Sequence, residues 1–205
     1  MRATGFSATA VLAAVLVAAA GLAGAASAKQ TIVFIHHGEK PAKGLGQLDC
    51  RGLNRSLALP AVIERQFGRP DAILAPSPSA QKDDRGIRYD YVRPLATIEP
   101  TAVAFGLPVE TRVGFEDVAG LTATLEAPER REALVLVAWE HRIIDAVARE
   151  LLRRHGGDPA LVPDWGPADY DGVDVVTIDW SGPTPTATFA RGAEGLNDLP
   201  DACPK

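Results

Sequence analysis

Two short stretches of the chain consist almost entirely of apolar residues, and both lead to a histidine. The first, residues 32–35, runs directly into His36 and His37, and the second, residues 133–138, is followed closely by His141. Unbroken apolar runs of this length are typical of strands buried on both faces of an α/β sheet. We expect the two strands to lie side by side, with His37 and His141 at the edge where such sheets bind their ligands.

Apolar residues recur at helical spacing in much of the remaining chain. The segments with this pattern are residues 53–67, 93–105, 117–125 and 143–152. Pro60 lies inside the first segment and is expected to kink this helix or to restart it, since proline cannot donate the helical hydrogen bond. Pro94 stands in the first turn of the second segment, where proline is well tolerated.

Strand and loop signals fill the gaps between these helices. Short apolar runs mark two further strands, residues 71–75 and 108–111. Polar composition indicates a loop at residues 81–88 and a loop or lid at residues 158–172. Residues 173–190 alternate around a turn, as in a hairpin. This order predicts a three-layer α/β sandwich with a mostly parallel central sheet, helices on both faces and a C-terminal antiparallel hairpin.

The N-terminal region has the pattern of a secretory signal peptide. Arg2 precedes a run rich in Ala, Val and Leu over residues 10–26, and small residues at Ala26 and Ala28 mark a cleavage site. We therefore expect residues 1–28 to be removed and residues 29–205 to form one periplasmic or secreted domain. The alternative is an uncleaved membrane anchor, although the run is short for ~30 Å of hydrocarbon.

The net charge limits the classes of binding partner, and the cysteines bear on the compartment. Without Arg2 the domain has 20 basic and 26 acidic residues, a formal charge of 20 − 26 = −6. No basic run is present, which argues against a nucleic-acid partner, and no membrane contact is expected after signal cleavage. The only cysteines, Cys50 and Cys203, are expected to pair in an oxidising compartment. Two free thiols are the alternative.

An arginine opens the helix that lies between the two histidine-bearing strands. Arg93 offers a planar fork of donors that matches phosphate oxygens, and the first N–H groups of its helix could point the same way. A neutral imidazole at the end of a strand can attack phosphorus. In phosphoryl transfer the protein mainly positions the attacking and leaving groups in line and places positive donors around the phosphoryl oxygens. The arrangement therefore suits this chemistry.

These residues resemble motifs of the histidine phosphatase superfamily, the phosphoglycerate mutase-like fold, along nearly the whole domain. That family has Arg-His-Gly-Glu/Ala after its first strand, and here residues 36–41 read His-His-Gly-Glu-Lys-Pro. The segment that begins at Arg93 is similar to the family's second phosphate-binding helix. The resemblance implies that His37 becomes phosphorylated, that His141 is the second catalytic histidine and that Arg93 binds phosphate.

His36 stands where the family has an arginine. Losing one donor aimed at a developing charge typically costs ~10²–10³ in rate, and histidine replaces arginine only when it is protonated. If His36 binds phosphate, we expect weak activity confined to mildly acidic pH, where a partly protonated His36 coexists with a neutral His37. For the general acid we favour Glu116, with Asp117 and Glu140 as alternatives.

The sequence thus favours an exported phosphatase that acts on a small phosphomonoester or a phosphohistidine, through a phosphohistidine intermediate and without a cofactor. Its partner would be a small phosphorylated molecule or phosphate. The alternative is a weakened or inactive phosphate-binding protein on the same fold. A metal site formed by His36, His37 and Glu39 is disfavoured because adjacent strand residues point to opposite faces. A mutase is disfavoured because the chain lacks room for that group's long insertions.

Overall fold

A six-stranded sheet forms the centre of the computed structural model, which describes residues 1, 28–84 and 86–205. In spatial order its strands are β5 (Val109–Glu110), β2 (Ala72–Leu74), β6 (Leu134–Trp139), β1 (Lys29–His36), β7 (Gly172–Asp179) and β8 (Thr186–Ala193). The first four are parallel, while β7 is antiparallel to both β1 and β8. This confirms the predicted mostly parallel sheet with a C-terminal antiparallel hairpin.

The two strongly apolar strands are neighbours, as predicted. β1 pairs in parallel with β6, so that Ile32 lies opposite Val135 and Ile35 opposite Ala138. These side chains are fully buried, as expected for strands covered on both faces. Because parallel strands end at the same edge of a sheet, both histidine-bearing segments emerge together.

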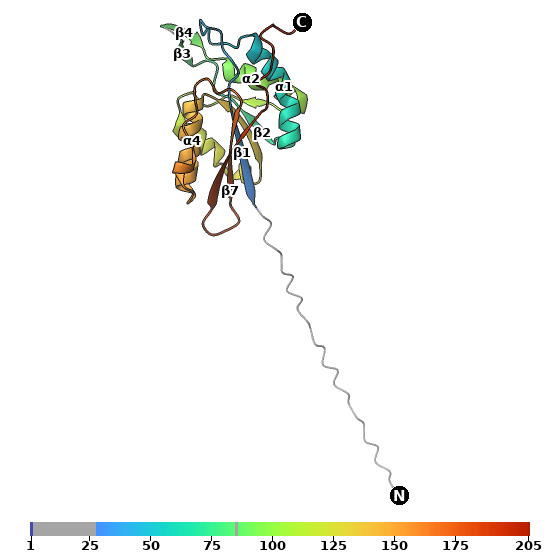
Figure 1. The fold of residues 1–205 in the computed structure, drawn as a ribbon. Helices are drawn as coiled ribbons and strands as arrows, with labels where there is room; N and C mark the ends of the chain where they lie inside the picture. Colours follow the sequence, from blue (N-terminus) through green and yellow to red (C-terminus); the bar gives the residue numbers. More distant parts are fainter. Residues whose placement is uncertain (2–27, 85) are drawn as a thin grey trace.

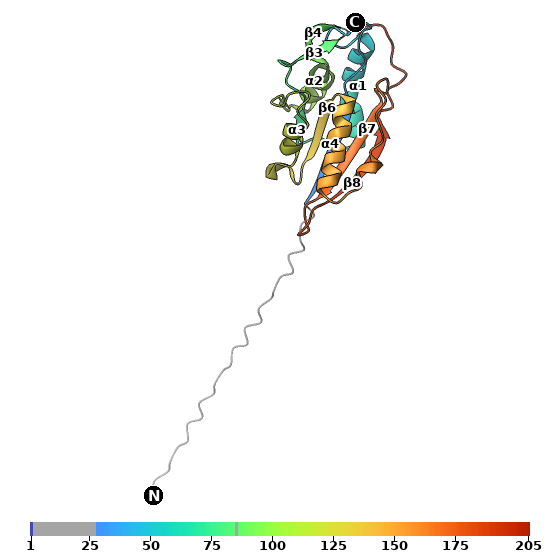
Figure 2. The same cartoon turned by 90° about the vertical axis from the view of Figure 1, so that its left-hand side faces the viewer.

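Helices cover the two faces of the sheet. They are α1 (Cys50–Gln66), α2 (Arg93–Phe105), α3 (Val118–Leu125) and α4 (His141–Arg154), with short 3₁₀ turns at Pro128–Arg130 and Pro159–Leu161. One apolar core contains residues of α1 and α2, and the other contains residues of α3 and α4. Figures 1 and 2 show α4 on one face of the sheet, with α1 and α2 on the other. The predicted three-layer sandwich is confirmed.

The sequence predicts that Pro60 kinks the first helix or restarts it, and of these two alternatives the restart is wrong. α1 runs as one helix from Cys50 to Gln66 through the proline. A proline in a helix interior removes one backbone hydrogen bond and costs ~3 kcal/mol. The side chains of Leu59 and Ile63 are buried in the core beneath the helix, and tertiary packing of this kind outweighs local propensity.

The expected loop at residues 81–88 is also wrong. Strands β3 (Gln81–Asp84) and β4 (Ile87–Asp90) form an antiparallel hairpin of their own. The turn includes Gly86 at φ 83°, a conformation that glycine adopts readily. The strands escaped prediction because they are polar and lack the apolar alternation of a half-buried strand. Figure 1 shows the hairpin at the same end of the molecule as the C-terminus.

The predicted disulfide between Cys50 and Cys203 is present, with the two Cα atoms 4.4 Å apart. It fastens the C-terminal tail to the first turn of α1. The amide of Asn54 adds two hydrogen bonds to the tail, at 2.9 Å to the carbonyl of Pro200 and 2.8 Å to that of Ala202. In the part of the chain that the structure describes, no helix has the length and apolar character needed to cross a bilayer. The predicted signal peptide lies almost entirely outside the described residues.

Removing this disulfide should destabilise the protein measurably. The bond joins residues 153 positions apart in sequence, and cross-links of native domains typically contribute about 2–5 kcal/mol. We expect the double variant Cys50→Ser/Cys203→Ser to lose a free energy of unfolding within that range in urea titrations. As the control, a reductant should lower the stability of the wild type and leave that of the variant unchanged. Equal stabilities of variant and oxidised wild type would contradict the prediction.

Candidate active site

A small cavity of about 50 Å³ lies where β1 and β6 end. Its lining residues are His36, His37, Lys40, Lys82, Arg93, Glu140, His141, Pro167 and Tyr170. Such a volume accommodates a few water molecules or a group of phosphoryl size. The three histidine rings stand close together, since the centroid of His36 is 4.2 Å from that of His37 and 4.9 Å from that of His141. The fold therefore brings together His36, His37, Arg93 and His141, as the sequence predicts.

His37 is held as a neutral imidazole with one free nitrogen. Its Nδ1 lies 2.8 Å from the carbonyl oxygen of Gly38, and because a carbonyl can only accept, Nδ1 carries the hydrogen. The lone pair is therefore on Nε2. Burial first, then the neighbouring His36 and Arg93, lower the pKa of His37 well below its usual value. At neutral pH His37 is therefore a neutral imidazole whose Nε2 carries no hydrogen, and it is suited to nucleophilic attack.

The glycine after His37 is required by close packing. A Cβ on Gly38 would lie 3.0 Å from the Cα of Gly52, on the first turn of α1, so a larger residue would push the strand end away from the helix. The N–H of Gly38 donates to the hydroxyl of Thr97 at 2.9 Å. Thr97 belongs to α2, and the contact thus ties the nucleophile's segment to the helix that carries Arg93.

Burial favours the neutral form of His36 as well, whereas the expected partial protonation at mildly acidic pH depends on a bound phosphate that raises the pKa. Burial lowers its pKa to about 4 despite the opposing hydrogen bond to Asp169. Its Nδ1 donates to the carbonyl oxygen of Asp169 at 3.0 Å, and its ring stacks on Tyr170 with centroids 5.0 Å apart. The other nitrogen, Nε2, is buried without a hydrogen-bond partner among the described residues. In this tautomer Nε2 presents a lone pair rather than a donor.

Arg93 is fully buried and keeps two donors unused. Its Nη1 donates to the carboxylate of Asp84 at 2.6 Å, whereas Nε and Nη2 have no partner among the described residues. Burial opposes ionisation of Asp84, but the hydrogen bond from Arg93 outweighs it, and the pKa of Asp84 is lowered. Asp84 comes from the β3–β4 hairpin, so this hairpin orients the guanidinium.

The start of α2 contributes fewer backbone hydrogen-bond donors to the cavity than expected. The backbone N–H groups of Val92 and Arg93 both donate to the carbonyl oxygen of Gly46, at 3.1 and 3.0 Å, and Pro94 has no N–H group. Val92, Arg93 and Pro94 therefore offer no backbone N–H group to a ligand, whereas the side chain of Arg93 still does.

His141 and Glu140 stand together at the start of α4. Glu140 caps the helix by accepting from the N–H of Ile143. Its Oε1 lies 3.3 Å from Nδ1 of His141, 3.1 Å from Nε of Arg142 and 3.9 Å from Nζ of Lys82. Burial raises the pKa of Glu140, but these three neighbours outweigh it and leave the pKa lowered. Glu140 is thus an ionised group beside His141, although Nδ1 of His141 has no hydrogen-bond partner among the described residues.

Glu116 is exposed and does not line the cavity. It follows Phe115, whose ring lies 5.3 Å from Nζ of the cavity residue Lys82, so its segment borders the site. Asp117 caps α3 by accepting from the N–H of Gly120 at 2.8 Å, a structural role. Of the three carboxylates that the sequence offers as general acids, Glu140 is the one in the cavity lining.

Sequence reasoning missed Lys40, Lys82 and Tyr170 as residues of the cavity. Lys82 lies in the polar segment that was expected to be a loop, and Tyr170 in the expected lid. The lysine of the His-Gly-Glu-Lys motif was the only available signal, and it would have pointed to Lys40 alone. The described part of the chain contains no group of three or more His, Cys, Asp or Glu residues that could hold a metal ion.

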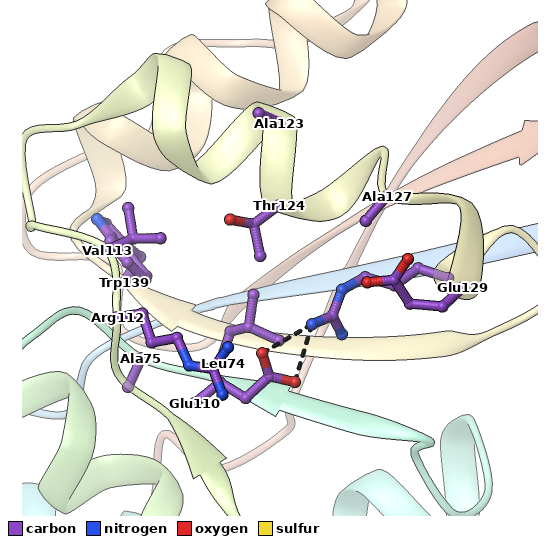
Figure 3. A pocket seen from close by; sticks show the side chains of 11 residues that line it. Leu74, Ala75, Glu110, Arg112, Val113, Ala123, Thr124, Ala127, Glu129 and Trp139 are labelled. Carbon is purple, nitrogen blue, oxygen red and sulfur yellow. Dashed lines mark hydrogen bonds and ion pairs between the residues drawn. The ribbon is translucent and has the colours of Figure 1, made fainter.

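A larger hollow of about 720 Å³ adjoins the cavity and shares with it Lys40, Lys82, Glu140, His141 and Pro167. Its size is that of a small-molecule site, and it gives a substrate's leaving group a place outside the inner cavity. Figure 3 shows a separate pocket of about 350 Å³ next to α3, where Arg130 donates twice to Glu110. None of its lining residues belongs to the histidine cavity.

Among the comparisons with known proteins, only the solved structures give matches, and these concern the fold. No protein-family model matches the sequence, and a search of curated proteins finds no match. Among solved structures, mycobacterial glucosyl-3-phosphoglycerate phosphatase in complex with inorganic phosphate superposes with a TM-score of 0.54 at 16% identity, covering 78% of this chain and 95% of that chain. A second structure, named "Mycobacterial hydrolase 2", gives a TM-score of 0.52 at 14% identity, covering 78% and 89%.

A third match comes from Nakamurella multipartitia. The structure named "Putative Phosphohistidine Phosphatase SixA" gives a TM-score of 0.50 at 16% identity, covering 79% of this chain and 95% of that chain. The structural neighbours are members of the histidine phosphatase superfamily. At these identities the likeness concerns the fold, and it is the fold that the sequence resemblance implies.

Proposed function

We propose that this protein is an exported phosphatase that hydrolyses a small phosphomonoester or a phosphohistidine through a phosphohistidine intermediate on His37. The observation that supports this most is the pairing of two groups in one cavity. His37 has a free imidazole nitrogen, and Arg93 has two unused guanidinium donors. A buried arginine with unused donors is costly unless a ligand takes them, and phosphate oxygens match its fork.

The reaction would proceed in two displacements. Nε2 of His37 attacks phosphorus, the bond to the leaving oxygen or nitrogen breaks, and the leaving group takes a proton. Water then attacks the phosphohistidine, Nε2 departs with its lone pair, and phosphate is released. Arg93 stabilises the charge on the phosphoryl oxygens throughout. His141 lines the same cavity and would donate a hydrogen bond to these oxygens from the ring nitrogen that carries its hydrogen.

Leaving-group protonation requires a carboxylic acid near the mouth of the cavity. Glu140 is unsuited because its ion pairs hold it ionised. Glu116 is solvent-exposed and follows Phe115, whose ring lies 5.3 Å from Nζ of the cavity residue Lys82. We therefore propose Glu116 as the proton donor.

Export fits the disulfide of the folded domain. Disulfides persist in oxidising compartments and are rare in the cytosol, and Cys50 pairs with Cys203. Together with the signal-peptide pattern of residues 1–28, this supports a periplasmic or secreted protein.

The test is hydrolysis of a generic aryl phosphate by the purified protein between pH 5 and 8, with orthophosphate binding measured in parallel. We expect both. Binding without turnover would replace the proposal with a phosphate-binding protein on the same fold, and the absence of both would remove it altogether.

The neutral state of His36 predicts how activity depends on pH. A phosphomonoester has its second pKa near ~6. Below that pH its P–OH group can donate to the lone pair on Nε2 of His36, whereas above it the dianion offers only acceptors. We expect kcat/KM of the wild type to fall as the pH rises from 6 to 8. His36→Arg should flatten this dependence and raise kcat/KM at pH 8 by ~10-fold or more, because it restores a permanent donor.

His36→Gln is the matched control, since it offers an amide donor without a charge. It should flatten the pH dependence with a smaller gain in rate. Thermal unfolding must show that each variant is folded, because arginine is larger than the buried ring it replaces. A folded His36→Arg with the wild-type pH profile would show that position 36 does not contact the phosphoryl group.

A further inference from the structure

The cavity contains a cation that comes from outside the histidine motifs. Lys82 lies on β3 and lines the cavity beside His37, Arg93 and His141. Its side chain is 19% exposed, and its Nζ lies 3.9 Å from Oε1 of Glu140. At that distance the ion pair includes no hydrogen bond. Glu140 therefore leaves the three donors of the ammonium available.

Two aromatic rings fix the ammonium in place. Nζ lies 4.9 Å from the ring centroid of Tyr91 and 5.3 Å from that of Phe115, distances at which a cation is attracted to a ring face. Burial lowers the pKa of Lys82, and the opposing effect of Glu140 does not fully offset it. An anion bound in the cavity would offset that cost, since an opposite charge favours the ionised form.

The remaining groups leave a phosphoryl group short of positive charge. His36 is neutral, Arg93 shares its charge with Asp84 at 2.6 Å, and Nζ of Lys40 lies 3.9 Å from the same carboxylate. A phosphate monoester carries up to two negative charges near neutral pH. We propose that Lys82 is the second cationic ligand of the phosphoryl group and compensates for the histidine at position 36. This inference rests on the proposed function, and it gives the β3–β4 hairpin two tasks, namely orienting Arg93 through Asp84 and supplying Lys82.

The experiment measures orthophosphate binding by calorimetry at pH 7 and low salt, so that it does not depend on turnover. Lys82→Met should weaken binding by about 10- to 100-fold, the effect of one charge-assisted hydrogen bond. Lys82→Arg should restore most of the affinity. Lys43→Met is the matched control, because Lys43 is exposed and does not line the cavity; its affinity should equal that of the wild type.

A purely structural role, in which Lys82 only neutralises Glu140, predicts something else. In that case Lys82→Met would no longer weaken phosphate binding in a Glu140→Gln background, where no carboxylate remains to be neutralised. Under our proposal Lys82→Met weakens binding in that background as much as in the wild type, because the ammonium itself binds phosphate. Wild-type affinity in a folded Lys82→Met variant overturns the inference, whatever the turnover. A wild type that binds phosphate without hydrolysing esters instead overturns the proposed function, and the binding comparison still decides the role of Lys82.

Discussion

Substituting alanine for His37 should abolish turnover of an aryl phosphate. The free Nε2 of His37 is the group that we expect to bond to phosphorus, and loss of a covalent nucleophile typically costs at least ~10³-fold in kcat. In the wild type Nδ1 is engaged with the carbonyl oxygen of Gly38 at 2.8 Å, so the attacking atom is Nε2. Alanine has no atom that could replace it. The measurement is kcat in parallel with acid-labile, alkali-stable phosphate label on the rapidly quenched protein. The label should appear in the wild type and be absent from His37→Ala.

His155→Ala is the control for this experiment. His155 is the one remaining histidine; it pairs with Glu126 at 2.8 Å and lies against Trp180, outside the cavity lining. The same change there should leave kcat and the label unaffected. A label that persists in His37→Ala would place the intermediate on another residue, with His141 the first to examine.

The centre of the sheet was predictable because the runs that form most of β1 and β6 are apolar. Residues 32–35 and 133–138 can hardly be anything but buried strands, and their parallel pairing follows from the helices between them. The β3–β4 hairpin was not predictable in this way. Its strands are polar, and the contacts that position it, such as the bond from Arg93 to Asp84, join residues whose proximity no local pattern reveals.

The same distinction between local patterns and distant contacts applies to the residues of the candidate site. Histidines that follow buried strands are visible in sequence, and so is an arginine at a helix start, because local structure places them. The protonation state of His36 depends instead on burial under Tyr170 and on a bond to Asp169, both in the segment that sequence describes only as a loop or lid. The availability of N–H groups at the start of α2 likewise depends on a distant carbonyl, that of Gly46.

Replacing Arg93 by lysine should lower kcat/KM by ~10²-fold or more, the typical cost of losing a donor that is aimed at developing charge. Lysine keeps a positive charge for Asp84, which would otherwise be left buried without its partner. It cannot reproduce the planar fork whose Nε and Nη2 have no hydrogen-bond partner in the part of the chain that the structure describes. The measurement is kcat/KM for an aryl phosphate together with the affinity for orthophosphate, and both should fall.

Arg130→Lys provides the matched control. Arg130 is also nearly buried, at 8% exposure, and it donates to a carboxylate, at 2.8 and 2.7 Å to Glu110, but it lies in the separate pocket beside α3. The same substitution there should leave both measurements unchanged even if it lowers thermal stability. Equal losses in the two variants would indicate a general effect of replacing a buried guanidinium. A loss confined to Arg93→Lys would instead identify its unused donors as the phosphate-binding fork, because the charge is conserved and only the geometry of donation differs.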